Sequence, residues 1–290
     1  MSLARLRDVS FTYAYAPRPA LRSVDLDLEP GLLHGLVGPN GSGKTTLCSV
    51  IRGMIPHFHP GDLAGGVEVL GRPAAHWDPA ELARRIGFVF QNPFSQISGI
   101  KDTVFEEIAL GLENLAVPRE QIIERVCEVI ELVGIGHLAG KNPSDLSGGQ
   151  RQLVAFAAII AMDAEFIVMD EPTSQLDPET SRRVFEIIRA LKDRGTSILL
   201  VEHDIDLLVE VADRLVLMHR GTVLAHGDVR EVIASDAFDI AQIRRPDVTD
   251  LALTLAARGR PLPRIPLTRD EAAALIAPLL REDPHADPAE

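Results

Sequence analysis

Cysteine is scarce in this sequence: Cys48 and Cys127 are the only two among 290 residues. Both fall in segments whose apolar residues recur at helical spacing, so we expect two buried free thiols and no disulfide. Such sparing use of cysteine is typical of a reducing compartment.

Long apolar runs are missing as well. The longest extends from Leu153 to Met162 and is closed by Asp163, which is about half of what a membrane-spanning helix needs. Residues 1–8 contain no apolar segment of the kind found in a secretory signal. We therefore expect a cytosolic protein, for which any association with a membrane comes through a partner.

Positive charge is in short supply: 29 Lys and Arg face 42 Asp and Glu, which gives a formal net charge of −13. Proteins that bind nucleic acid usually carry a basic patch, so no nucleic-acid partner is expected. With 46% hydrophobic and 24% charged residues, the composition is that of an ordinary globular protein. The length suffices for one large domain and a small appendage.

The strongest feature that is present is segment 38–45, which reads G-P-N-G-S-G-K-T and matches the phosphate-binding P-loop pattern. A buried strand is predicted before it and a helix after it, the context in which backbone N–H groups and a helix N-terminus face phosphates. Lys44 would reach the β- and γ-phosphates of ATP, and Thr45 would hold Mg²⁺. The predicted ATP-binding residues of this segment are Gly38, Pro39, Asn40, Gly41, Ser42, Gly43, Lys44, Thr45 and Thr46.

Polar residues follow three further apolar segments that are predicted to be buried strands: Gln91, the pair Asp170 and Glu171, and His203. Strands that alternate with helices and end in polar groups predict an α/β fold with a P-loop core. Asp170 would supply a second group directed at Mg²⁺. Glu171 would polarise the water that attacks the γ-phosphate.

A helical pattern extends from Thr103 to Val133, with apolar residues at helix spacing and charged residues between them. The sequence L-S-G-G-Q follows at 146–150, ahead of an apolar helix predicted over 151–162. We expect this block to form a helical subdomain of about residues 92–162 that is inserted into the core.

The composition changes after Ser235, where prolines cluster. One helix is predicted there, from Thr268 to Leu280, with Thr268 as its N-cap and Glu271 completing a capping box. Residues 281–290 have the composition of a disordered tail.

The motif at 146–150 matches the signature sequence of one family, and the other motifs occur in that family's order. Gln91 corresponds to its Q-loop, 174–177 to its D-loop and His203 to its switch histidine. Residues 1–235 therefore resemble the nucleotide-binding subunit of an ATP-binding-cassette (ABC) transporter.

The resemblance implies an architecture and a reaction. It implies a RecA-like P-loop core with an N-terminal antiparallel β-subdomain over residues 1–235, and it leaves 236–290 as a small C-terminal extension. It also implies an ATP hydrolase that uses ATP and Mg²⁺. ATP would lie between the P-loop of one subunit and the signature motif of a second ATPase subunit, identical or related.

Individual roles follow from the same resemblance. His203 would contact the γ-phosphate, and Gln91 would sense Mg²⁺ and the attacking water. Tyr13 would stack on adenine, with Tyr15 as the alternative. The further nucleotide contacts implied are Tyr13, Gln91, Ser147, Gly148, Gly149, Gln150 and Asp177, and the implied Mg²⁺ ligands are Thr45, Gln91 and Asp170.

A narrower resemblance rests on Gly53–Pro56, Gln91–Gln96 and Leu112–Leu115. These segments look like the ATPases of energy-coupling-factor (ECF) importers, which take up vitamins or metal ions. Segment 268–273 resembles that subfamily's tail, which can support dimerisation. The implied partner is one or more integral membrane transport subunits.

Other functions stay open at this point. Gln175 and Leu153 replace residues that are common in the family, which leaves the subfamily and the substrate in doubt. The alternatives are another type of ABC importer or exporter, a soluble ABC ATPase of DNA repair or the ribosome, and a module that binds ATP without hydrolysing it. Long coiled-coil insertions and basic arms, usual in the soluble class, are lacking, and Glu171 and His203 argue against the last alternative.

A docking surface for the membrane partner is predicted on residues 91–100 and on the helical insert that follows them. Phe94, Ile97 and Ile100 are apolar residues in an otherwise polar stretch, and an exposed apolar patch commonly marks a binding site. The alternative is that they pack beneath the helical insert.

Overall fold

A six-stranded sheet forms the centre of the molecule, with strand order β10-β9-β3-β8-β7-β6. The computed structural model describes residues 2–91 and 96–281 of the chain, so the predictions for Phe94 and for a disordered tail at 282–290 lie outside it. Neighbouring strands from β6 to β9 are parallel, and β10 is antiparallel to β9. The strands are β3 (Leu33–Val37), β6 (Ile86–Val89), β7 (Phe166–Asp170), β8 (Ser197–Val201), β9 (Arg214–His219) and β10 (Thr222–Asp228).

Alternate residues of these strands enter two separate hydrophobic cores. In β7, Ile167 and Met169 face the helices, whereas Phe166 and Val168 face a second sheet. Because both faces are covered, β3, β6, β7 and β8 are buried along their whole length, as a parallel sheet requires.

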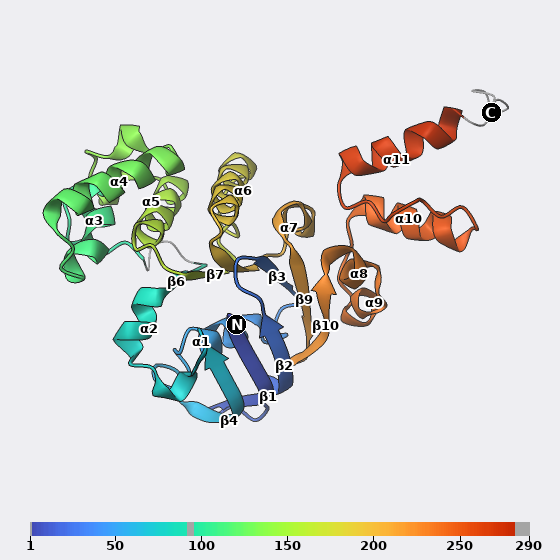
Figure 1. Cartoon of the computed structure of the whole chain (residues 1–290), viewed down its shortest axis with the longest axis horizontal. Helices are drawn as coiled ribbons and strands as arrows, with labels where there is room; N and C mark the ends of the chain where they lie inside the picture. The colour runs from blue at the N-terminus through green and yellow to red at the C-terminus, as the bar shows by residue number, and fades with distance from the viewer. Residues whose placement is uncertain (1, 92–95, 282–290) are drawn as a thin grey trace.

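The second sheet is antiparallel, with strand order β2-β1-β4-β5, and lies below the central sheet in Figure 1. It consists of β1 (Ala4–Tyr13), β2 (Leu21–Leu28), β4 (Gly61–Val69) and β5 (Arg72–Pro73). Strand β4 is nine residues long. Its first half has little apolar character but pairs through the main chain with β1, from Tyr13 opposite Gly61 onward.

Helices α3 (Val104–Asn114), α4 (Arg119–Val133) and α5 (Gly148–Ala161) lie together at one end of the central sheet (Figure 1). The helical pattern predicted as one stretch is therefore two helices, since Pro118 is the N-cap of α4. Cys48 is buried as predicted, but the prediction for Cys127 is wrong because it is exposed. Val126, Val129 and Ile130 occupy the buried face of α4, and position 127 points away from it.

The remaining helices are distributed around the sheet (Figure 1). They are α1 (Lys44–Ile51), α2 (Pro79–Arg85), α6 (Pro178–Asp193), α7 (Ile205–Val211), α8 (Val229–Ala234), α9 (Ala237–Ala241), α10 (Asp247–Ala257) and α11 (Arg269–Arg281). Short 3₁₀ turns occur at Ala74–His76, Gly136–Leu138 and Pro143–Asp145. Within the described residues, every helix falls short of the length and hydrophobicity that crossing a bilayer requires.

The C-terminal extension contains more helix than its sequence indicated. The predicted final helix is present as α11, but α9 and α10 were missed. Helix α10 buries only Thr249 and Ala252, so its apolar stripe is too short to stand out by periodicity.

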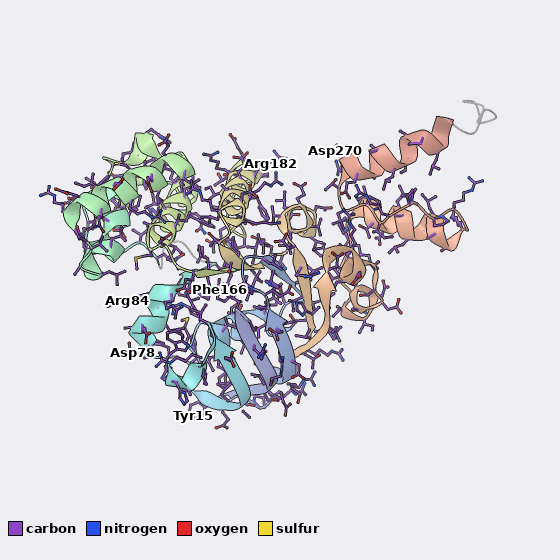
Figure 2. The ribbon with its side chains drawn as sticks, viewed as in Figure 1. Tyr15, Asp78, Arg84, Phe166, Arg182 and Asp270 are labelled. Atoms are coloured by element: carbon purple, nitrogen blue, oxygen red, sulfur yellow. The ribbon has the colours of Figure 1, made fainter. Side chains whose placement is uncertain are left out.

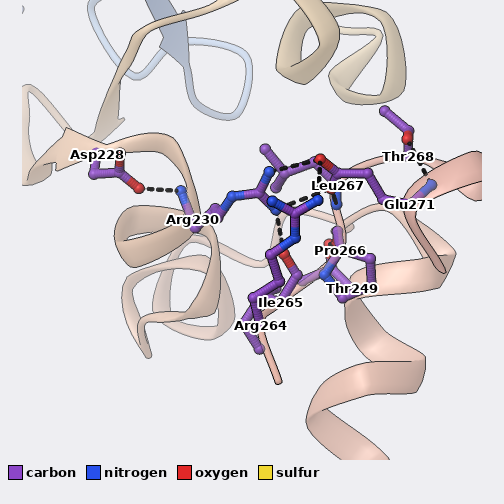
Figure 3. A network of polar contacts seen from close by, with 9 residues as sticks. All are labelled: Asp228, Arg230, Thr249, Arg264, Ile265, Pro266, Leu267, Thr268 and Glu271. Atoms are coloured by element: carbon purple, nitrogen blue, oxygen red, sulfur yellow. Dashed lines mark hydrogen bonds and ion pairs between the residues drawn. The ribbon is translucent and has the colours of Figure 1, made fainter. Parts of the chain in front are cut away.

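An ion pair joins α11 to Arg230 of α8 (Figure 3). The Arg230 guanidinium donates to both carboxylate oxygens of Glu271, at 2.9 and 2.7 Å, and these bonds lower the pKa of Glu271 to about 2. Thr268 caps α11 by accepting the Glu271 N–H at 3.2 Å. The Glu271 carboxylate accepts the Leu267 N–H instead of closing the predicted box on Thr268.

Candidate nucleotide-binding and hydrolysis site

The P-loop connects β3 to α1 and encloses a pocket of about 490 Å³. Gly41 and Gly43 have φ values of 75° and 104°, a left-handed backbone that glycine adopts without strain. A Cβ on Gly43 would lie 2.7 Å from the carbonyl oxygen of Ala20. The glycines thus let the chain turn tightly around a space that backbone N–H groups can line.

Lys44 lies in this pocket with only 5% of its surface exposed. Its Nζ donates to the carbonyl oxygens of Gly38 and Pro39, at 2.8 and 3.3 Å. Burial lowers the pKa of Lys44, and the charges of Glu171 and Asp170 oppose this effect. The ammonium group is therefore held over the loop by neutral carbonyls, where an anion can reach it.

Asp170 ends strand β7 and is 6% exposed. Among the described residues its Oδ1 has no hydrogen-bond partner. Burial raises its pKa, against a hydrogen bond from Thr45. A carboxylate oxygen without a partner beside a hydroxyl fits Mg²⁺, which prefers oxygen ligands and takes few of them from protein when it is bound with a nucleotide. The described residues contain no group of three or more His, Cys, Asp or Glu suited to a metal, so such an ion would depend on phosphate oxygens.

Glu171, directly after β7, contacts one residue that follows β6 and one that follows β8. Its Oε2 accepts a hydrogen bond from Gln91 Nε2 at 2.8 Å, and its Oε1 lies 2.7 Å from Nε2 of His203. Glu171 has a φ of 51°, an uncommon conformation that is often found at functional sites. The Glu171 N–H donates to the carbonyl oxygen of Val201 at 3.0 Å, which fixes this backbone between β7 and β8.

The signature motif lies away from this pocket in the described chain. Ser147 is the N-cap of α5: its Oγ accepts the Gln150 N–H, and Gln150 Oε1 accepts the Ser147 N–H. Gly148 and Gly149 begin the first turn, where Gly148 is exposed and Gly149 is half-buried. The described lining of the P-loop pocket includes none of residues 147–150, so the fold does not bring the signature to the chain's own P-loop.

Asp177 is likewise outside the P-loop pocket. It caps α6 by accepting the N–H groups of Glu179 and Thr180, each at 3.0 Å. The Thr180 hydroxyl also donates to it, and these bonds lower the pKa of Asp177.

Tyr13 lies beside the P-loop helix, with its hydroxyl 3.0 Å from Oγ1 of Thr46. Its ring packs edge-on against Phe11, with 4.7 Å between ring centroids. Tyr15 is fully exposed and lies at the outer end of the antiparallel sheet (Figure 2). This geometry favours Tyr13 for a contact with the base.

Glu202 is a buried site residue for which the sequence analysis predicts no role. It is 3% exposed, directly before His203, and accepts hydrogen bonds from Thr173 and from the His203 backbone. The only signal in the sequence was a charged residue at the end of an apolar strand.

Comparison with known proteins agrees with this geometry. Residues 21–174 match the family described as ABC transporter. A protein of Pyrococcus abyssi named as an ABC transporter ATP-binding protein is 39% identical over 97% of this chain and 100% of its own length. A protein of Streptomyces avermitilis of the same designation is 39% identical over 80% of this chain, which corresponds to 42% of that longer protein.

Two solved structures have the same fold. The protein cbiO1 of Clostridium perfringens, described as part of the ABC transporter complex cbiONQ, matches with a TM-score of 0.71 at 26% identity, over 89% of this chain and 97% of that one. The ATP-binding cassette MJ0796, in a dimeric post-hydrolysis state with ADP and Pi, matches with a TM-score of 0.67 at 27% identity, over 78% and 99% of the two chains.

Fold, site and comparisons together define a P-loop nucleotide hydrolase. The chain belongs to the ABC transporter family, in which it is an ATP-binding cassette that hydrolyses ATP.

Proposed function

We propose that this cassette is the ATPase of an ECF-type importer, in which hydrolysis of MgATP powers uptake of a vitamin, a metal ion or another small solute through membrane subunits. The observation that carries the magnesium-dependent chemistry is the unpartnered Oδ1 of buried Asp170, beside Thr45 and next to Glu171. Asp170 and Thr45, with Gln91, would hold the ion. The ion would supply charge neutralisation at the phosphates.

In this proposal the protein groups divide the work. Backbone N–H groups of the P-loop and Lys44 bind the phosphates. Glu171 accepts a proton from the attacking water, since its carboxylate is already oriented from both sides by Gln91 and His203. Tyr13 supports the base. Ser147, Gly148, Gly149, Gln150 and Asp177 act on the nucleotide of a second ATPase subunit, because they lie outside the P-loop pocket of their own chain.

The importer assignment has its own support. The matched structure cbiO1 is described as part of a transporter complex, and segments 53–56 and 112–115 resemble those of ECF ATPases. An apolar groove of about 660 Å³, lined in part by Phe88, Phe90 and Met162, would receive a membrane subunit.

The predicted docking segment is only partly suited to that contact. Ile100 is 74% exposed, whereas Ile97 packs partly buried against the core. We therefore place the contact on the groove and Ile100 rather than on Ile97. Residues 1–235 would form the cassette and 236–290 an accessory unit.

Two measurements test the proposal. Hydrolysis by the purified chain should require Mg²⁺ and stop when EDTA is added. Co-expression with the membrane proteins encoded by neighbouring genes should then give a complex whose vesicles accumulate solute when the cassette and ATP are enclosed inside them. Release of solute in that assay would indicate an exporter. Intact hydrolysis by a chain that forms no complex with any membrane protein would indicate a soluble ABC ATPase.

A further inference from the structure

Glu202 ties together the two loops that carry the reacting groups. Its Oε1 accepts from the Thr173 hydroxyl at 2.7 Å and from the Thr173 N–H at 3.2 Å. Its Oε2 accepts from the His203 N–H at 3.2 Å. Thr173 follows β7 and Glu171, and Glu202 follows β8. One carboxylate thus bridges the loop that contains Glu171 and the loop that contains His203.

Burying the Glu202 carboxylate is unfavourable in free energy. Glu202 is 3% exposed and Thr173 is 8% exposed, and no cation pairs with Glu202 among the salt bridges of the described residues. Burial raises its pKa to about 7, against the bonds from Thr173 and His203. Placing a carboxylate here costs free energy that an apolar residue would not cost, so its three acceptor contacts indicate a positional role.

We infer that Glu202 is a positioning residue for ATP hydrolysis: it sets the distance between His203 and Glu171 and anchors the 173–177 loop. The inference rests on the proposed roles of Glu171 and His203. Glu202 touches neither the P-loop pocket nor the reacting atoms, and it acts through the backbone of His203 and through Thr173.

The chemistry of an amide shows why a carboxylate is required. Both carboxylate oxygens accept, one from Thr173 and the other from the His203 N–H. A glutamine has one oxygen and one NH₂ group. In either orientation, its NH₂ group would face an N–H donor, and that contact would push one of the two loops away.

The test compares Glu202→Gln and Thr173→Val with the wild-type chain in steady-state hydrolysis and in ATP binding. We expect kcat to fall by about ten- to a hundredfold in Glu202→Gln, the range for a buried hydrogen bond to a charged group when it is fully expressed in the transition state. The fall in kcat should be smaller in Thr173→Val, because this variant keeps the backbone N–H at position 173. The dissociation constant for ATP should not change, since the P-loop is untouched.

A second readout does not depend on activity. The ring resonances of His203 in ¹³C-histidine-labelled protein, identified by their loss in His203→Ala, should shift in Glu202→Gln. The matched control is Glu107→Gln, because Glu107 is also buried and its two carboxylate oxygens also accept, one from the Ser98 N–H at 2.6 Å and the other from the Ser98 hydroxyl at 2.7 Å. This control should leave the His203 resonances in place.

The outcomes separate the inference from the proposal beneath it. Wild-type hydrolysis by Glu171→Gln and His203→Ala would overturn the proposed roles and the inference together. Loss of activity in those two variants, with unchanged kcat in Glu202→Gln, would overturn the inference alone. A fall in kcat without a shift of the His203 resonances would mean that Glu202 is only a structural residue. The same would follow if kcat fell together with Tm to the same extent as in Glu107→Gln.

Discussion

Oε1 of Glu171 lies 2.7 Å from Nε2 of His203, although 32 positions separate the two residues along the chain. The contact exists because β7 and β8 are adjacent parallel strands, paired from Phe166 opposite Ser197 to Asp170 opposite Val201. The residues after each strand therefore emerge at the same edge of the sheet. The first prediction concerns this contact.

Replacing Glu171 with glutamine should retain ATP binding and slow hydrolysis by ~10²–10⁴, the usual range for a lost general base. The amide keeps a partner for Gln91 and His203 but cannot accept a proton from water. Phosphate release and binding of a fluorescent ATP analogue would be measured side by side. Glu124→Gln, an exposed change on α4, serves as control, and normal turnover in Glu171→Gln would remove the assignment.

Lys44→Ala should abolish ATP binding or turnover. Lys44 is the cation of the P-loop pocket, and its Nζ is already held at the loop by Gly38 and Pro39. Hydrolysis would be measured at saturating MgATP, with Lys141→Ala as the exposed control. Unchanged hydrolysis would contradict the phosphate-binding role.

Stability should depend on pH through Glu202. Its pKa rises from an ordinary value of 4.5 to about 7 in the fold, so between these values the folded chain holds a proton that the unfolded chain has lost. The free energy of unfolding contributed by Glu202 is thus fully present below about pH 4.5 and is lost as the pH rises through 7. The full span is about 3 kcal/mol, since a difference of one in pKa corresponds to about 1.4 kcal/mol.

Urea unfolding of wild type and Glu202→Gln across this pH range would measure the effect. The difference in unfolding free energy between the two chains should change by an amount of that order in the stated direction. A constant difference would mean that Glu202 titrates alike in both states.

Arg230→Ala should loosen α11 from the cassette. The side chain donates to both oxygens of Glu271 and to the carbonyl of Ile265, so its loss leaves the carboxylate with only the longer ionic contact to Arg264, at 3.5 Å. We expect cleavage by subtilisin between Ala257 and Arg269 to accelerate about tenfold, because local opening becomes easier by roughly one charge-assisted bond. Arg258→Ala, exposed in the same segment, is the control; equal cleavage in both variants would show that the ion pair does not hold the extension.

How far the sequence predicts this molecule depends on whether a feature is local. The central strands are apolar throughout and the P-loop is continuous in sequence, so the α/β core was predicted correctly. The first half of β4 was not, because its glycines pair with β1 through main-chain atoms that carry no side-chain signal. Whether Cys127 is exposed depends on which face of α4 packs against α5. The apolar periodicity of the segment does not define the edge of that face to within one residue.

The candidate site divides in the same way. Parallel pairing alone places four residues together, because each lies at or after the end of a strand and these strands end at one edge of the sheet. They are Lys44, Asp170, Glu171 and His203. The bridge from Glu202 to Thr173 requires the register of β7 against β8 and the turn after Glu171. Neither is encoded within a single segment, which is why Glu202 had no predicted role.

The last prediction concerns the second ATPase subunit. Each chain carries two separated halves of a site: the P-loop with Glu171, and Ser147 at the start of α5, outside the P-loop pocket. If the halves act between chains, Lys44→Ala and Ser147→Arg chains should each be inactive alone and regain hydrolysis when mixed. A mixed dimer then holds one site with both lesions and one site with neither.

The mixing experiment needs two companions. ATP-dependent dimerisation of the wild-type chain should be confirmed by size exclusion, because obligate pairing with a related second ATPase would hide recovery. Binding of ATP by Ser147→Arg should also be measured, since its own P-loop is intact.

If wild-type homodimers hydrolyse ATP and confirmed mixed dimers stay inactive, two explanations remain. Use of the signature within its own chain predicts that Ser147→Arg binds ATP poorly, because the lesion then lies in its only site. Strict coupling of two sites predicts normal binding. Each P-loop still binds its nucleotide, but neither site hydrolyses ATP unless the other site is also intact.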